Sequence, residues 1–146
     1  MIQEEQQGKA FDSGFRVFYL DDGNMKDVYF SPEDYTQDLL SMLESNIKED
    51  RNDLDLLFGC ILDWGLPLAM KYECVSVGNY HVHLYNDNDL VACFDNKLDR
   101  DVIEYVAKLH PLRVVFKDKV FMDSPSKINV EEIFKSISPE TSIKVI

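Results

Sequence analysis

Hydrophobic and polar positions form a clear sequence of elements in the C-terminal part of the chain. An apolar run, Leu112–Phe116, is followed by a charged break at Lys117–Lys119 and then by a polar loop. Next come an amphipathic helix, Val130–Ile137, and a second apolar run that ends with the chain. Asn129 is placed to cap this helix, and Glu132 completes a capping box with it. The order of strand, loop, helix and strand predicts a parallel strand pair with a crossover helix.

The middle of the chain has the pattern of a β-meander. Three runs, Ala69–Val77, Tyr80–Tyr85 and Leu90–Phe94, have the apolar and aromatic content of strands. Two turn sequences, Gly78-Asn79 and Asn86–Asp89, separate them. The last run is almost entirely apolar, which is typical of an interior strand.

Further elements are predicted on either side of the meander. Phe15–Leu20 (FRVFYL) alternates in the manner of a strand. Ser31-Pro32 begins a helix, because Ser caps free amides and Pro suits the first helical position, and this helix is expected to end near Lys48. Arg100–Leu109 is predicted to be another helix, with Asp99 as its cap.

The expected fold class is α/β, with α+β as the alternative. Hairpins come first and αβ units last, which predicts a mixed β-sheet with helices packed on its faces. With 146 residues, the chain is long enough for one domain with a real core. We expect residues 1–14 to be a flexible lead-in and residues 15–146 to form that single domain.

The helix that opens at Arg51–Asp55, with Asn52 or Asp53 as its cap, is apolar on two sides. One stripe consists of Leu54, Leu57, Phe58, Ile61 and Leu62. The other consists of Leu56, Cys60 and Trp64. A helix of this kind is covered on both sides. Either the domain buries it centrally, or its second stripe meets another subunit, which makes Leu56, Cys60 and Trp64 candidate interface residues.

The net charge of −12 argues against a general nucleic-acid-binding surface, because such surfaces use Lys and Arg to neutralise phosphates. The charge is uneven: residues 31–63 hold nine acidic and two basic side chains, whereas residues 108–127 hold five basic and two acidic ones. Candidate phosphate contacts in this basic strip are Arg113, Lys117, Lys119 and Lys127. The alternative is that they are ordinary solvated cations between packed apolar residues.

Residue types suited to catalysis or metal binding occur in weak patterns only. His81 and His83 share one face of a strand, but a metal site needs a third ligand. Asp95 and Asp118 follow two apolar strands, where a pair of carboxylates could hold Mg²⁺, although Asp also commonly begins a turn. No glycine-rich cofactor loop or hydrolase motif is present, so the residues alone identify no active site.

The three cysteines, Cys60, Cys74 and Cys93, are spaced like no zinc or redox motif. Each has apolar neighbours along the chain. We therefore expect three small buried thiols.

Four segments, in order, resemble the C-terminal domain of the methylase (Mod) subunit of type III restriction–modification systems. The tail VVFKDKVFMDSPSKINVEEIFKSISPETSIKVI is similar to the family's closing strand, Arg-Asp-Ser-like break, K-x-N-x-E-Q-I-F helix and P-x-T-x-x-K-V-I end, with Lys117-Asp118-Lys119 at the break. FRVFYLDDGNMKDVYFSPEDY, IKEDRNDLDLLFGCILDWGLPL and NDNDLVACFD resemble three further family segments. The similarity covers residues 15–146.

The resemblance implies a function without catalysis in this chain. Family members are adenine-specific DNA methyltransferases that use S-adenosylmethionine and carry D-P-P-Y and F-x-G-x-G motifs, and this chain has neither motif. It implies an assembly domain that contacts the rest of the Mod subunit, a second Mod subunit or the restriction (Res) subunit, with DNA bound through the parent protein.

Two other functions remain as alternatives. The first is accessory binding to the DNA backbone through the basic strip. The second is a small Mg²⁺-dependent enzyme that uses Asp95 and Asp118. The polar, acidic N-terminus has no apolar signal region, and no run of 18 apolar residues occurs, so we expect a cytoplasmic protein that does not enter a membrane.

Overall fold

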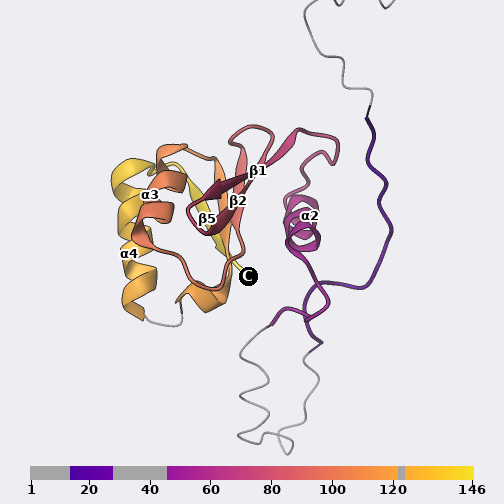
Figure 1. Ribbon diagram of the computed structural model, residues 1–146, viewed down its shortest axis with the longest axis horizontal. Coiled ribbons are helices and arrows are strands. Elements are labelled where there is room, and N and C mark those ends of the chain that lie inside the picture. Colours follow the sequence, from indigo (N-terminus) through magenta and orange to yellow (C-terminus); the bar gives the residue numbers. More distant parts are fainter. Residues whose placement is uncertain (1–13, 28–45, 122–123) are drawn as a thin grey trace, which may run out of the picture.

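A computed structural model describes residues 14–27, 46–121 and 124–146, with no side chains described for 124–128. The chain forms a five-stranded sheet with the strand order β1-β2-β3-β4-β5 (Figure 1). The strands are β1 (Tyr72–Val77), β2 (Tyr80–Tyr85), β3 (Leu90–Cys93), β4 (Arg113–Phe116) and β5 (Ser142–Val145). The first three pair antiparallel, and β3, β4 and β5 pair parallel. The sheet is therefore mixed, and the predicted α/β class is confirmed.

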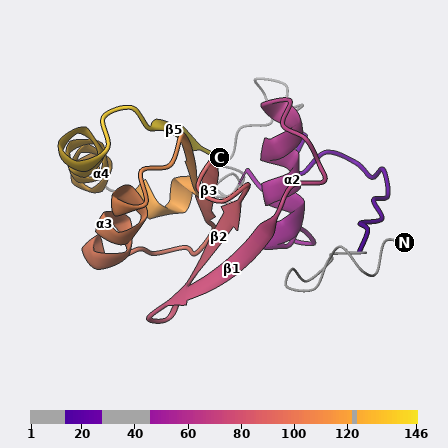
Figure 2. The same ribbon diagram turned by 90° about the horizontal axis from the view of Figure 1, so that it is seen from above.

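Helices cover both faces of this sheet. They are α2 (Asp53–Asp63), α3 (Arg100–Lys108) and α4 (Ser124–Ile137), and a short 3₁₀ helix, η2 (Asp118–Phe121), follows β4. Figures 1 and 2 show α2 on one face and α3 with α4 on the other. None of the helices in these described ranges has both the length and the apolar character needed to cross a membrane.

The predicted meander is confirmed, and turn residues with left-handed backbone conformations explain it. Gly78 has φ +63° between β1 and β2, and Asn86 and Asp87 have φ of 50° and 59° between β2 and β3. Glycine, asparagine and aspartate tolerate this conformation better than other residues. Strand β1 begins at Tyr72, three residues after the predicted start at Ala69.

The predicted crossover unit at the C-terminus is also confirmed, but its helix starts earlier than expected. Strands β4 and β5 are parallel, with Val114 opposite Ile143, and α4 connects them. Helix α4 begins at Ser124, so Asn129 lies inside the helix and the prediction that it is the cap is wrong. The physical reason is that Pro125 suits the first turn of a helix, so that the Ser-Pro pair starts α4 before Asn129 is reached.

Two predictions for the N-terminal part of the chain are corrected. Residues 15–20 were expected to form a strand, yet they have no regular secondary structure and no strand partner among the described residues. The helix expected over 31–48 falls mostly outside the described residues. Its end is wrong, because Ile47 forms an antiparallel bridge with Met25 and Lys48 N–H donates to Asn24 O at 3.0 Å.

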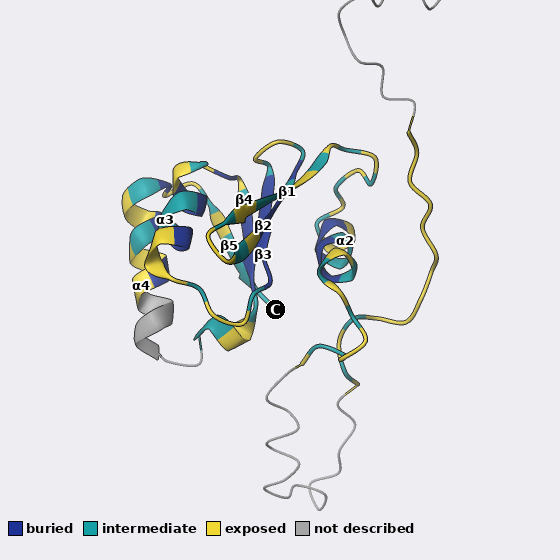
Figure 3. Ribbon diagram, in the orientation of Figure 1, coloured by how far each residue is buried: buried dark blue, intermediate teal, exposed yellow. Residues whose placement is uncertain are grey.

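Two hydrophobic clusters lie on opposite faces of the sheet, and β3 contributes to both. All four residues of β3 are buried, which confirms that it is an interior strand. Leu90 and Ala92 point into the cluster under α2, whereas Val91 and Cys93 point into the cluster under α3 and α4. Figure 3 shows this pattern, with β3 and the inward sides of the helices buried, β1 and β5 at the two edges of the sheet exposed or intermediate, and residues 14–22 exposed.

Candidate functional site

Helix α2 is fixed at both ends by residues that the sequence places there. Asn52 is the cap: its side chain accepts a hydrogen bond from Asp55 N–H at 3.0 Å, and the Asp55 carboxylate accepts one from Asn52 N–H at 2.9 Å. This reciprocal capping box satisfies two amides at the start of the helix. At the other end, Gly65 takes the left-handed conformation, with φ +66°, that commonly terminates a helix.

The inner side of α2 packs on the sheet. It consists of Leu56, Leu57, Cys60 and Ile61, which form a cluster with Tyr85, Ala92 and Val115 among others. Leu56 is 1% exposed and Cys60 is 3% exposed, so these two candidate interface residues are covered by the domain itself. The physical reason is that the apolar face of the sheet must be covered, and α2 is the helix that covers it.

The third candidate interface residue, Trp64, is half-buried and held between two cations. The guanidinium of Arg113 lies 5.9 Å from its ring centroid, and the Lys144 ammonium lies 5.1 Å from it. Arg113 also pairs with Asp89, and Lys144 pairs with Asp63 at 2.9 Å. Trp64 therefore closes the C-terminal end of α2 against the sheet through cation–π contacts within the chain.

The outer side of α2 carries the apolar stripe that stays exposed. It consists of Leu54, Phe58 and Leu62, which lie one helical turn apart from each other. Leu54 is 44% exposed and Leu62 is 62% exposed, whereas Phe58 is half-buried. Phe18 meets Phe58 edge-on, with ring centroids 5.0 Å apart, so residues from the N-terminal part of the chain lie against this side.

Segment 14–27 runs past the outer side of α2, away from the sheet, as Figures 1 and 2 agree. Arg16 anchors it: one terminal nitrogen donates to Leu68 O at 3.0 Å and to Met70 O at 2.5 Å. The same guanidinium lies 5.9 Å from the centroid of the Phe58 ring. Arg16 and Phe18 thus face α2 and fasten the segment to it.

The remaining side chains of residues 15–20 point away from the domain. Phe15 is 87% exposed, Val17 63%, Tyr19 89% and Leu20 103%. Together with Leu54 and Leu62 they form what we call the outer α2 surface. All six side chains are apolar and at least 44% exposed, in a chain whose net charge is −12.

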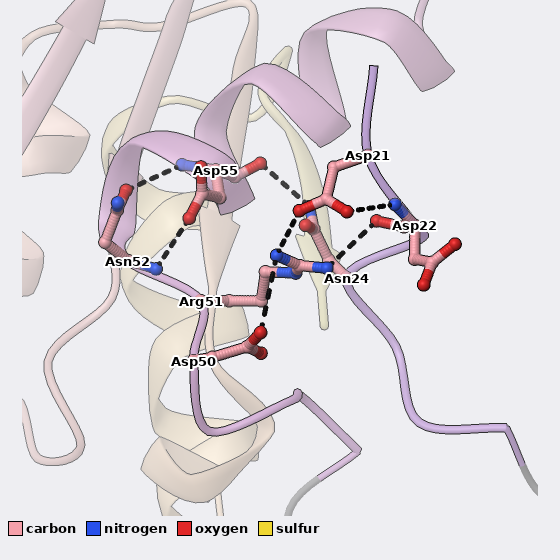
Figure 4. Close-up of polar contacts among 7 residues, drawn as sticks. All are labelled: Asp21, Asp22, Asn24, Asp50, Arg51, Asn52 and Asp55. Atoms are coloured by element: carbon pink, nitrogen blue, oxygen red, sulfur yellow. Dashed lines mark hydrogen bonds and ion pairs between the residues drawn. The ribbon is translucent and has the colours of Figure 1, made fainter. Parts of the chain in front are cut away.

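A polar network fixes the other end of segment 14–27 (Figure 4). Arg51 pairs with the Asp21 carboxylate at 2.9 Å and donates to Asp22 O at 3.2 Å. The Asn24 amide donates to Asp55 O at 2.8 Å. The Asp22 N–H and the Arg51 guanidinium both lower the pKa of Asp21 by stabilising its ionised form. Segment 14–27 is therefore joined to the N-terminal end of α2.

The basic strip predicted from the sequence is divided by the fold. Arg113 begins β4, is 28% exposed at its side chain and is paired with Asp89. Lys117 and Lys119 follow the opposite end of β4, and Lys119 is exposed. The side chain of Lys127 lies outside the described residues. The structure therefore does not bring Arg113 together with the lysines, and its charge is already neutralised within the chain.

His81 and His83 do not act as a pair. His83 is buried, with Tyr72 Oη 2.9 Å from its Nδ1 and an Asp53 carboxylate oxygen 3.3 Å from its Nε2. His81 is exposed, and its backbone N–H donates to the Asp95 carboxylate at 2.8 Å. His83 therefore acts as a cross-strand contact that links the sheet to α2.

Asp95 and Asp118 follow the neighbouring parallel strands β3 and β4, but each has a structural contact of its own. The Asp95 carboxylate accepts from His81, and Asp118 N–H donates to Ile146 O at 2.7 Å. Within the described ranges, no three His, Cys, Asp or Glu side chains are grouped so that they could hold a metal ion.

The cysteines differ in environment. Cys60 and Cys93 are buried, and burial raises the pKa of their thiols to about 11 and about 12. Cys74 is exposed, so the prediction of three buried thiols is wrong for this residue. It lies on β1, the edge strand of the sheet, where packing from neighbouring elements is least complete.

A groove of about 400 Å³ lies between α3 and α4, on the face of the sheet opposite α2. Its lining includes the apolar side chains of Leu98, Ile103 and Ile133. Arg100, which also lines the groove, donates to Glu104 at 2.7 Å, so this charged pair is satisfied within the chain. The groove could not be predicted from the sequence, because its apolar lining residues Leu98, Ile103 and Ile133 have the pattern of ordinary core positions.

Comparison with known proteins finds no match to this chain among family models, curated proteins or solved structures. The candidate site is therefore defined by geometry alone. Its residues were within reach of the sequence: Leu54, Phe58 and Leu62 recur at intervals of four, which places them on one side of a helix. The sequence does not indicate which side of this helix packs against the sheet and which side stays exposed.

Proposed function

We propose that this chain is a non-catalytic assembly domain, the C-terminal part of a type III restriction–modification DNA (adenine-N6) methyltransferase that acts in the cytoplasm. The domain joins its Mod subunit to a second Mod subunit or to the Res subunit. The observation that carries the proposal is the outer α2 surface, where Phe15, Tyr19, Leu20 and Leu62 are each more than half exposed.

Physical chemistry supports a contact role for this surface. Exposed apolar patches are uncommon on monomeric proteins, and those rimmed by polar residues usually mark interaction sites. The outer α2 surface includes the exposed aromatic side chains of Phe15 and Tyr19, and the charged residues Arg51, Asp21 and Asp22 lie where segment 14–27 meets the N-terminal end of α2. Aromatic side chains are enriched at protein–protein interfaces, whose rims are polar.

The part of the chain that the structure describes offers no fitting site for the methyl donor of the proposed parent family. It lacks the D-P-P-Y and F-x-G-x-G motifs. In open α/β sheets such cofactors lie at the carboxyl ends of parallel strands, against glycine-rich turns. Here β3 is followed by Phe94-Asp95 and β4 by Lys117-Asp118, with no glycine at either position. S-adenosylmethionine is therefore assigned to the rest of the parent protein, and no step of methyl transfer is assigned to this chain.

The test is to replace Leu62 by Asp and compare it with Leu112→Asp. Leu62 is 62% exposed on the outer α2 surface, and Leu112 is 58% exposed before β4, so both changes add one charge at an equally exposed leucine. Mass would be measured by light scattering over a range of concentrations, and capture of purified Mod and Res subunits by pull-down.

We expect Leu62→Asp to weaken association about tenfold or more, because a charge would be desolvated in an apolar contact. Leu112→Asp should leave association unchanged. Equal behaviour of the two variants would contradict the proposal, as would a wild-type chain that stays monomeric and captures neither subunit.

A further inference from the structure

We infer that strand β1 pairs antiparallel with β1 of a second copy of this chain, about a two-fold axis that passes between Cys74 and its own copy. The inference rests on the proposed assembly function and deepens it, because it names the partner and the mode of contact. It uses the free edge of the sheet, which shares no residue with the outer α2 surface. Three features of β1 carry it: its place at the edge, the direction of its hydrogen-bonding groups, and the absence of features that block an edge.

Strand β1 is the first strand in the order of the sheet, so it has a neighbouring strand on one side only. It pairs with β2 through six consecutive residues, from Tyr72 opposite Tyr85 to Val77 opposite Tyr80, without a bulge. The other side of an edge strand presents a row of unpaired N–H and C=O groups, which is a template for a further strand. Proteins commonly recognise extended segments by adding them to such an edge.

One hydrogen bond shows which backbone groups of β1 are free. Asn86 N–H donates to Lys71 O at 2.8 Å, just before the pairing of β1 with β2 begins. Residues of an antiparallel strand turn their N–H and C=O groups alternately toward one side and the other. Lys71 therefore faces β2, and every second residue after it does the same. The residues of β1 that face outward are Tyr72, Cys74 and Ser76, and their backbone groups have no hydrogen bond to another described residue.

The outward residues are spaced symmetrically about Cys74, so the edge is complementary to itself. With a two-fold axis at this position, Cys74 lies opposite its own copy, and Tyr72 lies opposite Ser76 of the second copy. Each outward residue then exchanges hydrogen bonds with an outward residue of the other strand. The side chains also fit, because the large ring of Tyr72 lies beside the small side chain of Ser76.

A two-fold axis one residue earlier, at Glu73, satisfies fewer groups. It sets the two Glu73 carboxylates directly opposite each other, and like charges in this position are destabilising. It also pairs Ser76 with Met70 of the second copy, whose N–H already donates to Tyr85 Oη at 3.3 Å. This register therefore leaves Ser76 without a full partner.

A two-fold axis one residue later, at Val75, fails at the other end of the strand. It pairs Tyr72 with Gly78 of the second copy, which lies in the turn after β1 with φ +63° and does not continue the strand. Tyr72 then has no strand residue opposite it. Of these three registers, the one centred on Cys74 gives every outward group a partner.

Strand β1 lacks the features that usually keep sheet edges apart. Natural edge strands are protected by bulges, by proline, by unpaired charged side chains such as lysine, or by being very short. Strand β1 is six residues long, has a regular register and contains no proline. Its one charged residue, Glu73, is paired with Lys71 at 2.9 Å. The edge is therefore open, and a strand added to a sheet avoids the marginal stability of an isolated two-stranded ribbon.

The experiment uses the full chain and its exposed thiol, Cys74. Opposite residues of a hydrogen-bonded antiparallel pair have Cα atoms about 5.5 Å apart, within the range of a disulfide. Oxidation in air with copper phenanthroline should therefore link Cys74 to its own copy. The matched control is Ser76→Cys in a Cys74→Ser chain, because Ser76 is also exposed but lies roughly 14 Å along the strand pair from its own copy.

A second measurement follows the dimer itself by light scattering over a range of concentrations. Ser76→Pro removes an outward N–H but no hydrogen bond to β2, and proline is tolerated in edge strands. Ser76→Thr keeps the N–H and is the control. Circular dichroism and thermal unfolding check that both variants are folded. If Ser76→Pro does not fold, the comparison of the two thiol positions still decides.

We expect the Cys74 thiol to cross-link at least tenfold faster than the thiol of Ser76→Cys. We expect Ser76→Pro to weaken the dimer tenfold or more, whereas Ser76→Thr should leave it nearly unchanged. Equal rates at the two thiol positions would mean that the links form by random collision, and they would overturn the inference. A folded Ser76→Pro chain that dimerises as well as the wild type would overturn it too.

Distinct outcomes separate this inference from the proposed function. If Leu62→Asp disrupts association and Ser76→Pro does not, the edge pairing is wrong and the assembly role stands. If Ser76→Pro disrupts the dimer while Leu62→Asp and Leu112→Asp behave alike, the edge pairing stands and the outer α2 surface is not the contact. A chain that stays monomeric overturns the pairing, whereas capture of a Mod or Res subunit by that monomer still supports the assembly role.

Discussion

The Arg51 guanidinium lies 2.9 Å from the Asp21 carboxylate, which joins two parts of the chain that are thirty residues apart. Arg51 directly precedes the cap of α2, and Asp21 follows the apolar residues of segment 14–27. A second bond, from the Asn24 amide to Asp55 O, acts in the same place. The position of the outer α2 surface therefore depends on polar contacts at one end and on Arg16 and Phe18 at the other.

The first prediction concerns the pH dependence of the Asp21 contact. The pKa of Asp21 is lowered from its ordinary value of 3.8, first by the Asp22 N–H and then by Arg51. A lowered pKa in the folded state stabilises the fold above pH 3.8, and this contribution is lost as the pH falls through the folded-state pKa. Asp21→Asn should therefore lower the unfolding temperature at pH 7 by about 1–3 °C, because exposed ion pairs contribute little.

Thermal unfolding of the wild type and Asp21→Asn, followed by circular dichroism between pH 7 and pH 3, tests this. The difference between the two should shrink below pH 4 as Asp21 becomes protonated in the wild type. A difference that stays constant down to pH 3 would show that the carboxylate charge is not the cause.

The second prediction concerns Gly59 and Asn24. A Cβ atom added at Gly59 would lie 2.5 Å from Asn24 Nδ2, which must then leave its bond to Asp55 O. Alanine raises helix propensity by about 1 kcal/mol over glycine, and loss of the hydrogen bond costs about 1 kcal/mol. Gly59→Ala alone should therefore change stability little. In the Asn24→Ala background, the same change should stabilise the protein by about 1 kcal/mol.

Urea unfolding of the two single variants and the double variant measures this coupling. We expect Gly59→Ala to change the free energy of unfolding more favourably in the Asn24→Ala background than in the wild type. Additive effects would mean that the alanine methyl group and Asn24 do not compete for space.

The third prediction separates the two sides of α2. Leu56 is 1% exposed on the inner side and Leu54 is 44% exposed on the outer side. Leu56→Ala should destabilise the domain by about 2–5 kcal/mol through lost burial and a cavity. Leu54→Ala should cost only about 0.5 kcal/mol, because the side chain is partly solvated in both states. Chemical denaturation of the two variants measures the difference, and equal costs would contradict the observed orientation of α2.

The fourth prediction concerns thiol reactivity. Cys74 is exposed, whereas Cys60 and Cys93 are buried with pKa values raised to about 11 and about 12. Only the thiolate reacts readily, and it needs access to the reagent. A thiol-specific reagent at pH 8 should therefore label one cysteine per folded chain and all three in denaturant. Cys74→Ser should abolish the fast phase, and rapid labelling of that variant would contradict the assigned burial.

The sequence predicted the sheet well because its local signals agree with its long-range contacts. The two turns contain residues that tolerate left-handed backbone conformations, in Gly78-Asn79 and in Asn86–Asp89. Strand β2 therefore begins after the first turn and ends before the second. The fully apolar run Leu90–Phe94 could only be an interior strand, because apolar side chains on both faces require cover on both faces.

The candidate site could not be predicted in the same way. Helix α2 is apolar on two sides, so periodicity located both stripes but left open which one the sheet covers. In the structure Leu56 and Cys60 are buried and Trp64 is half-buried. Alternation in residues 15–20 indicates a strand, but it does not say where the partner strand is. The contact between Arg51 and Asp21 depends on segment 14–27 lying against the start of α2. No local sequence pattern predicts this contact between residues that are far apart in the chain.

The last prediction tests where α4 begins, because the stability change expected for Asn129→Ala has opposite signs for the two possible starting positions. If Asn129 capped a helix that began at Val130, Asn129→Ala would destabilise the protein by about 1 kcal/mol. The helix begins at Ser124, so Asn129 is an exposed interior residue. Alanine is a better helix former than asparagine, and the substitution should stabilise by about 0.5 kcal/mol.

Asn52→Ala is the matched control, because Asn52 is a true cap whose side chain accepts from Asp55 N–H at 3.0 Å. That variant should lose about 1 kcal/mol. The two asparagines lie on different helices and share no contact, so the double variant should show the sum of the two effects. Urea unfolding measures the stability change of each variant. A gain for Asn129→Ala with a loss for Asn52→Ala would support a helix α4 that begins at Ser124. A loss in both variants would support a shorter helix that begins at Val130.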